Sequence, residues 1–277
     1  MANRAIVFLC SSINTDLITF AKTLVSINYD VFICSDRVHS EVDDLIHFIG
    51  NNPDDAELSQ KANFYGCVSF IPNRACSRDK ALWWFCTQCH NKYTFIWMIE
   101  DDVLIPHNKV LENIDNKYLD QDLLCTSYNI NRNGSIRGWW HWKSAKDEKL
   151  PLPWVNSMIC AIRVSQKLLN GIYYSTLKYS KLLMNELLFT TICEHNKLSY
   201  ANPAELSTIF YRNKFQYREF RDKSNNLFHP VKDIEIHKSI HREFQNIFNA
   251  YAIRQEIQLK ANKYRKIGLF RDKITTI

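Results

Sequence analysis

Glycine and proline are scarce in this sequence, which has only 6 glycines and 7 prolines among its 277 residues. No segment is low in complexity and no internal repeat is present, so long disordered linkers are not expected. Apolar residues make up 46% of the chain, and a chain of this length and composition can bury a substantial core. We therefore expect a globular protein.

Long apolar runs are also absent. No run reaches the roughly 18 residues that span a bilayer, and the N-terminal run at residues 5–10 is too short for the core of a signal peptide. Nine cysteines are present, but Cys10, Cys34, Cys125 and Cys160 stand within apolar runs, where a free thiol packs like a small hydrophobic side chain. These features predict a reduced, cytoplasmic protein with no signal peptide and no transmembrane segment.

The charge is only mildly unbalanced. Lysine and arginine number 35 and the acidic residues 29, which gives a net charge of +6. A surplus of this size favours an anionic ligand such as a nucleotide diphosphate, and it gives no reason to expect nucleic acid as a partner.

The first hundred residues alternate between strand-like and helix-like patterns. Strands are expected at residues 5–10, 29–34, 64–71 and 95–99, and helices at 15–27, 40–50 and 78–92. Later elements are expected as helices at 109–118, 165–173 and 182–195, strands at 122–128 and 157–163, and a helical tail from residue 234. Long loops are expected at 129–154 and 201–230. The alternation predicts an α/β fold with a mostly parallel central sheet covered by helices on both faces.

Three consecutive carboxylates, Glu100, Asp101 and Asp102, directly follow the apolar strand at 95–99. The carboxyl ends of the strands are where open α/β sheets bind ligands. Adjacent like charges repel one another unless they are solvated or share a cation, and carboxylate oxygens suit Mg²⁺ or Mn²⁺. The pattern predicts a metal site for a phosphorylated substrate, with a solvated strand end as the alternative.

Polar residues also follow the other early strands. Ser11 and Ser12 come after the first strand, and Asp36 and Arg37 after the second, where a ribose and a base would lie across the sheet edge. In the alternative interpretation the serines only turn the chain.

Basic residues begin the helix at 78–92. Arg78 and Lys80 combine positive charge with the free N–H groups of a helix start, a combination that attracts phosphate. They are otherwise interpreted as solvating the helix end.

Two further motifs stand out. Trp139, Trp140 and Trp142 crowd the loop at 129–154 and suggest a platform for sugar rings, or else a small core beneath the loop. The string Cys86-Thr87-Gln88-Cys89-His90 matches the c-type haem attachment pattern, but it lies mid-helix and no second C-x-x-C pair is present for zinc, even with Cys67 and Cys76 nearby. Core thiols are the preferred interpretation of that string.

The order of these parts resembles the GT-A glycosyltransferases over residues 4 to about 237. The residues that carry the resemblance are Glu100-Asp101-Asp102, in the place of the family's D-x-D metal motif, and the helix Ser77-Arg78-Asp79-Lys80-Ala81-Leu82-Trp83-Trp84 before it. The resemblance implies one large GT-A domain at 1–241, with a nucleotide-binding half at 1–105 and an acceptor-binding half at 106–241. A basic helical tail at 242–277 follows. It also implies transfer of a sugar from a nucleotide-diphosphate sugar, most simply UDP-linked, to a hydroxyl of a glycan or glycoprotein.

The resemblance also suggests roles for individual residues. Asp102, Glu100 and the late His229 would bind Mn²⁺ or Mg²⁺. Because the motif begins with Glu rather than Asp, it stays open which of the three carboxylates contacts the ion. Asp101 would contact the donor ribose or the metal's water shell. Arg78, Asp79 and Lys80 would guide the donor, and Lys232 would face its diphosphate. Glu186, one acid in an otherwise apolar helix, would be the general base of an inverting reaction; burial would raise its pKa toward the working pH.

Two other functions remain open from the sequence. A sugar nucleotidyltransferase usually carries a glycine-rich loop after the first strand, whereas Cys10-Ser11-Ser12-Ile13-Asn14 has no glycine. A non-catalytic carbohydrate-binding module would use only the tryptophan loop. The tail residues Lys260, Lys263, Arg265, Lys266 and Arg271 suggest contact with an anionic membrane or a partner, or simply a solvated helix face.

Overall fold

The computed structural model describes residues 3–68 and 75–274. The chain divides into two compact units, Met1–Lys232 and Asp233–Ile277. The second unit is a single helix, α9 (Ile234–Ile274), which begins where the helical tail was expected. The division falls earlier than the expected boundary at residue 241. The basic tail residues proposed for membrane contact lie beyond the part of α9 whose side chains are described.

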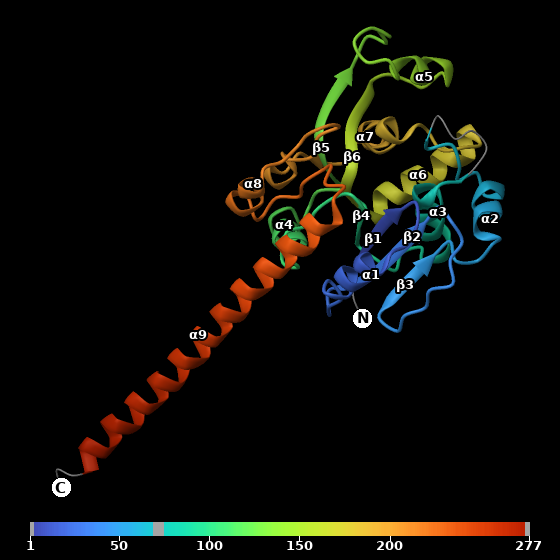
Figure 1. Ribbon diagram of the computed structural model, residues 1–277. Helices are drawn as coiled ribbons and strands as arrows, with labels where there is room; N and C mark the ends of the chain where they lie inside the picture. Colours follow the sequence, from blue (N-terminus) through green and yellow to red (C-terminus); the bar gives the residue numbers. More distant parts are fainter. Residues whose placement is uncertain (1–2, 69–74, 275–277) are drawn as a thin grey trace. The chain divides into compact units, whose positions relative to one another are not determined.

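Within the described residues, the first unit contains a seven-stranded sheet of order β3-β2-β1-β4-β6-β5-β7 (Figure 1). The strands are β1 (Arg4–Cys10), β2 (Tyr29–Ser35), β3 (Ile46–Ile49), β4 (Phe95–Glu100), β5 (Leu123–Asn131), β6 (Trp154–Ser165) and β7 (Tyr200–Ala201). The strands from β3 to β4 are parallel, β6 runs antiparallel to both of its neighbours, and β7 is parallel to β5. The predicted α/β class with a mostly parallel sheet is confirmed.

Helices cover both faces of this sheet. In the first unit they are α1 (Thr15–Lys22), α2 (Asp55–Lys61), α3 (Ser77–Trp83), α4 (Val110–Lys117), α5 (Trp142–Asp147), α6 (Gln166–Tyr179), α7 (Asn185–His195) and α8 (Tyr217–Asp222). Alternate residues of β1 enter two different apolar clusters. Val7 belongs to a cluster that includes residues of α3, α6 and α7, and Phe8 belongs to a cluster that includes residues of α1 and α4. A strand that is apolar on both faces therefore occupies the centre. No helix in the described ranges has the length and apolar character needed to cross a bilayer.

A buried polar network holds α4 against the sheet. Asp115 of α4 is fully buried and accepts hydrogen bonds from the Tyr29 hydroxyl, from Trp97 Nε1 at 3.1 Å and from Arg163 Nη1 at 3.0 Å. Arg4 Nη1 lies 3.4 Å from the same carboxylate. One helix side chain thus joins four strands, β1, β2, β4 and β6.

Several predicted elements are wrong. The helix expected at 40–50 is absent: β3 occupies residues 46–49 and pairs with β2, because backbone bonds to an open sheet edge outweigh the weak helical pattern. Residues 64–68 form no strand, and 69–71 of that expected strand lie outside the described residues. The helix expected at 78–92 ends as α3 at Trp83 and continues only as one π-helical turn, Trp84–Gln88. Helix α2 was not anticipated, and the expected loops contain α5 and α8.

Candidate functional site

An acidic cluster lies at the carboxyl end of β4. Glu100 is the last residue of the strand, and Asp101 and Asp102 form the turn after it. His229 reaches this turn because Phe228 pairs with Leu104, and Val231 N donates to Asp102 O at 2.8 Å. Its Nε2 lies 3.2 Å from Asp102 Oδ1 and 3.8 Å from Glu100 Oε2. The structure therefore brings His229 to two acids that precede it by 127 and 129 positions in the chain.

The orientation of the imidazole is set by its other nitrogen. His229 Nδ1 lies 2.6 Å from the carbonyl oxygen of Phe210 and donates to it, since a carbonyl oxygen only accepts. This bond directs Nε2 toward the carboxylates. An oriented histidine beside carboxylates is the usual arrangement of a metal-binding imidazole.

Cys160 joins this cluster, although the apolar pattern predicted it as a core thiol. One ligand atom each from Glu100, Cys160 and His229 lies within 4.8 Å of the others. The antiparallel register pairs Ile99 with Ala161, which sets Cys160 beside Glu100. Nothing local in the sequence indicates that β6 is the antiparallel neighbour of β4, so the thiol could not be assigned to the site from its own segment.

Arg78 contacts the cluster through an ion pair with Glu100. The buried guanidinium of Arg78 lies 2.7 Å from Glu100 Oε1 and donates to the carbonyl oxygen of Ile159 at 3.2 Å. The charge of this arginine is therefore committed to a carboxylate of the site. In this structure Arg78 positions Glu100, and its expected contact with the sugar-nucleotide donor stays a prediction.

The acids of the cluster differ in their ionisation. Burial opposes ionisation of Asp102, but the hydrogen bond and charge of His229, together with the charge of Lys232, outweigh it and lower the pKa of Asp102. Burial likewise opposes protonation of His229, yet Asp102 and Glu100 raise the pKa of the imidazole. Asp101 is exposed in part, but the surrounding protein reduces the solvation of its carboxylate. This desolvation, followed by the charges of Asp102 and Glu100, raises the pKa of Asp101 to about 6. The cluster is electrostatically suited to a cation.

The ligand set fits a divalent metal ion. It offers carboxylate oxygens from Glu100 and Asp102, an imidazole nitrogen from His229 and the sulfur of Cys160. Mg²⁺ prefers oxygen ligands almost exclusively, whereas imidazole suits later divalent ions. Which of the two ions expected from the sequence would bind stays a prediction, and the imidazole ligand is the argument for Mn²⁺.

A cavity of about 890 Å³ opens beside the cluster, and we call it the acidic cavity. Its wall contains Glu100, Asp102, Cys160 and His229, and it also contains three basic side chains, Arg212, Lys214 and Lys232. Only Lys232 was anticipated from the sequence. Arg212 and Lys214 belong to the expected covering loop at 201–230, where a basic residue carries no local signal of what it faces.

A second cavity, of about 510 Å³, adjoins the first and is called here the tryptophan cavity. Its lining includes Trp139, Trp140, His141, Ser127, Asn129, Asn156 and Ser157. Met158, Asn185, Glu186 and Tyr211 line both cavities. The two cavities are therefore contiguous, and the residues that they share form the junction between them.

Glu186 lies at this junction, in the first turn of α7. Burial raises the pKa of its carboxyl group, and the nearby charge of Arg78 lowers it only in part. Its Oε2 is buried and has no hydrogen-bond partner among the described residues. A carboxylate with one free oxygen and a raised pKa, set between two cavities, has the properties of a general base.

The three tryptophans of the aromatic loop do not act alike. Trp139 and Trp140 line the tryptophan cavity, and the side chain of Trp140 is 75% exposed. Trp142 is 6% exposed and packs between Trp139 and Trp154, with ring centroids 4.8 and 6.3 Å away. The expected acceptor contact of Trp142 is therefore not supported, because its ring belongs to the core beneath the loop.

The residues after β1 and β2 lie at the same edge of the sheet but outside the lining of the acidic cavity. Ser11, Ser12 and Arg37 are exposed. Asp36 Oδ1 accepts from Ser77 N at 2.5 Å and so holds the start of α3. Their expected contact with a nucleoside stays a prediction.

Asp79 and Lys80 are turned into the protein. Asp79 is 1% exposed and accepts from Cys76 N at 3.0 Å and Cys67 N at 3.2 Å. Lys80 is also 1% exposed, and its ammonium donates to the carbonyl oxygens of Ser35 and Asp36. Both side chains attach α3 to neighbouring loops. Their burial conflicts with the expected contacts to the sugar-nucleotide donor.

The cysteine string in the π-helical turn has no metal-site geometry. No group of three or more potential ligands among the described residues includes Cys67, Cys76, Cys86 or Cys89. Cys86 donates to the Leu169 carbonyl oxygen at 3.4 Å. These observations agree with core thiols.

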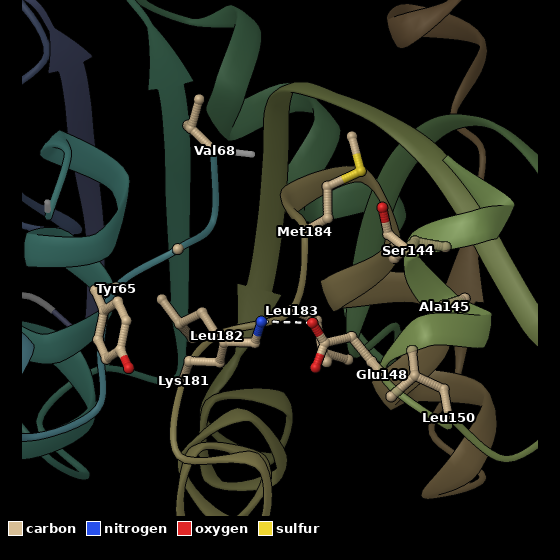
Figure 2. Close-up of a pocket in the computed structure, with 12 residues that line it drawn as sticks. Tyr65, Val68, Ser144, Ala145, Glu148, Leu150, Lys181, Leu182, Leu183 and Met184 are labelled. Atoms are coloured by element: carbon tan, nitrogen blue, oxygen red, sulfur yellow. Dashed lines mark hydrogen bonds and ion pairs between the residues drawn. The ribbon is translucent and has the colours of Figure 1, made fainter. Parts of the chain in front are cut away.

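A third, smaller cavity of about 220 Å³ adjoins the tryptophan cavity through Val68 and Met184, which line both. Figure 2 shows the ion pair between Lys181 and Glu148 across it, with leucine side chains around. Its two charged groups are therefore already paired with each other.

Comparison with known proteins gives limited information. No family model matches the chain, and no curated protein matches it. Among solved structures it is similar to mouse xyloside xylosyltransferase 1 in its apo form, with 12% identical residues and a TM-score of 0.41, over 83% of this chain and 97% of that one. At this level of likeness, function has to be argued from the site itself.

Proposed function

We propose that the protein is a GT-A-type glycosyltransferase that moves a sugar from a nucleotide-diphosphate sugar, most simply a UDP-sugar, to a hydroxyl group with the help of a divalent cation. One observation carries the proposal: a carboxylate and imidazole cluster and three basic side chains line a single cavity. A cation bound to a diphosphate has the matching distribution of charge. The position at the carboxyl edge of a mostly parallel sheet supports the same conclusion.

The chain's own residues divide the work of binding. Glu100, Asp102 and His229 would hold the cation, which supplies Lewis-acid neutralisation of the departing diphosphate. Arg212, Lys214 and Lys232 bind the remaining charge of the phosphate oxygens. Because these groups line one cavity, they favour the charge that builds up as the bond to the sugar breaks.

Glu186 takes the proton of the attacking hydroxyl. It lines both cavities, and so it reaches an acceptor in the tryptophan cavity while facing a donor in the acidic cavity. Attack from the side opposite the diphosphate inverts the anomeric centre, and the position of Glu186 at the junction supports its role as the base of such a reaction. Burial raises the pKa of Glu186 toward neutrality, which strengthens it as a base.

Calorimetric titration with UDP in Mn²⁺ and in EDTA tests the proposal. UDP should bind substantially more tightly in Mn²⁺, and Asp102→Asn, which removes the charge but keeps the size of the side chain, should abolish that difference. Asp222→Asn is a suitable control because it alters an exposed ion pair on α8. Equal affinity of the native protein for UDP in Mn²⁺ and in EDTA would contradict the metal role.

A panel of UDP-sugars with Mn²⁺ then identifies the donor through slow release of UDP. Release of pyrophosphate from UTP and a sugar 1-phosphate would instead indicate a nucleotidyltransferase. Saccharide binding without any nucleotide binding would indicate a carbohydrate-binding module.

A further inference from the structure

We propose that the tryptophan cavity holds an uncharged sugar ring, so that the acceptor is a neutral saccharide, and that Asn156 recognises one of its hydroxyl groups. This inference rests on the proposed transfer reaction for its biological meaning. The physical argument depends only on the lining of the cavity and can be tested as binding.

The charge of the lining differs sharply between the two cavities. The acidic cavity contains Arg212, Lys214 and Lys232. Among the described residues, those that line the tryptophan cavity include no lysine or arginine, and Glu186 is their one acid. Burial lowers the pKa of His141, which keeps that imidazole neutral near pH 7. An anionic acceptor would lose its hydration on entering this cavity and would meet no positive charge there. Burying an unpaired charge is costly. A neutral ligand meets no such penalty.

The side chain of Asn156 favours a polar ligand. Its side chain is 8% exposed, and its Oδ1 is buried without a hydrogen-bond partner among the described residues. A buried amide oxygen without a partner costs about 1–3 kcal/mol. Because a hydroxyl both donates and accepts, a sugar hydroxyl satisfies either end of this amide.

The sheet places further neutral polar groups beside Asn156. Asn129 of β5 is paired directly with Asn156 of β6, and both line the cavity. An irregularity of β5 between Thr126 and Tyr128 contains Ser127, whose φ is 33°, and Ser127 also lines the cavity. Bulges often redirect side chains next to binding sites. The two strands thus offer amides and a hydroxyl to one ligand.

Another part of the lining is aromatic. Trp140 is 75% exposed and packs against His141, and Trp139 is partly buried beside it. The C–H face of a sugar ring covers such an indole while its hydroxyls turn to polar neighbours. Aromatic and polar side chains, with no basic residue among the described part of the lining, are together the features of a site for a neutral carbohydrate. Glu186, at the open junction, then meets the hydroxyl that attacks the donor.

Saccharide binding to the full-length protein tests this inference, with intrinsic tryptophan fluorescence and saturation-transfer NMR as readouts. The probes are neutral gluco-, galacto-, manno- and xylo-disaccharides, their uronic acid or sulfated counterparts, and a serine-rich peptide. Neutral disaccharides should bind in preference to charged ones and to the peptide. Asn156→Ala should weaken that binding about tenfold, the equivalent of one lost hydrogen bond, and leave the Mn²⁺-dependent affinity for UDP unchanged.

Two further variants serve as a second test of the cavity and as a control. Asn129→Ala, at an exposed position that lines the cavity, should also weaken binding without affecting folding, and Asn113→Ala, on the exposed face of α4, should not. Preferred binding of charged probes or of the peptide, or unchanged affinity in both cavity variants, would overturn the inference. Failure of the proposed function is a separate result, since it appears as absent metal-linked UDP binding in the native protein.

Discussion

Replacing Asp115 with alanine should destabilise the first unit strongly. Arg163, which the carboxylate neutralises, has a side chain that is 0% exposed and lies over the Phe95 ring, 4.0 Å from its centroid. The guanidinium cannot reach water when its partner is removed. Its remaining bonds, to the carbonyl oxygens of Tyr118 and Gln121, satisfy hydrogens but do not neutralise the charge.

The magnitude follows from these contacts. Removing one partner of a buried ion pair costs about 3–5 kcal/mol, because the other charge stays buried. The Tyr29 hydroxyl and Trp97 Nε1 lose their acceptor as well, at about 1 kcal/mol each. We expect a loss of about 5–7 kcal/mol, a large fraction of the 5–15 kcal/mol by which domains are typically stable.

Urea unfolding followed by tryptophan fluorescence measures this loss as a shift of the midpoint at constant slope. Asp222→Ala, which breaks an ion pair whose side chains are 85% and 59% exposed, is the control and should change little. A double variant, Asp115→Leu with Arg163→Met, should be less destabilised than the sum of its single variants, because no charge stays unpaired. A loss below about 1 kcal/mol for Asp115→Ala would refute the reasoning.

Three more predictions concern the site. Trp140→Ala should weaken saccharide binding and leave the free energy of unfolding unchanged. Trp142→Ala, at a residue only 6% exposed, should lower the free energy of unfolding in urea by about 3–5 kcal/mol. Similar stability losses in both variants would contradict their different burial. Burial raises the pKa of Glu186, and a general base acts only when ionised, so the transfer rate should fall as pH decreases through a pKa above the ordinary glutamate range. Glu186→Gln should remove that acidic limb and lower kcat by about 10²–10⁴-fold with UDP affinity retained; an unchanged pH profile would exclude this base. Cd²⁺ titration should produce an ultraviolet thiolate-to-metal band that Cys160→Ser lacks, and a band that persists in this variant would show that Cys160 is no ligand.

The central strands and most of the long helices were predictable because their signals are local. Residues 5–10 and 95–99 are continuous apolar runs, and β1 and β4 are buried on both faces. Helix α6 begins where Ser165 accepts from Leu168 N at 3.2 Å, a capping pattern visible in the sequence. The short strand β3 was missed because its four residues acquire a strand conformation only by pairing with β2.

Side-chain direction was less predictable than position. Lys80 and Trp142 are residue types that bind phosphate and sugar, yet one donates to backbone carbonyls inside the protein and the other packs in the core. Arg212 and Lys214 were overlooked, although they face the acidic cavity. A sequence motif specifies which chemical groups are available, but not which of them the packing of neighbouring segments turns toward a ligand.

The amino-acid order alone settled the α/β class and the place of the acids at the end of a buried strand, because periodicity and a break from apolar to charged residues act over a few neighbours. Tertiary structure decided the composition of the site. Cys160 stands beside Glu100 through an antiparallel register, and His229 meets Asp102 through pairing between distant segments. Contacts between residues so far apart in the chain depend on how strands and loops pack, and that packing leaves no mark in the local pattern of either partner.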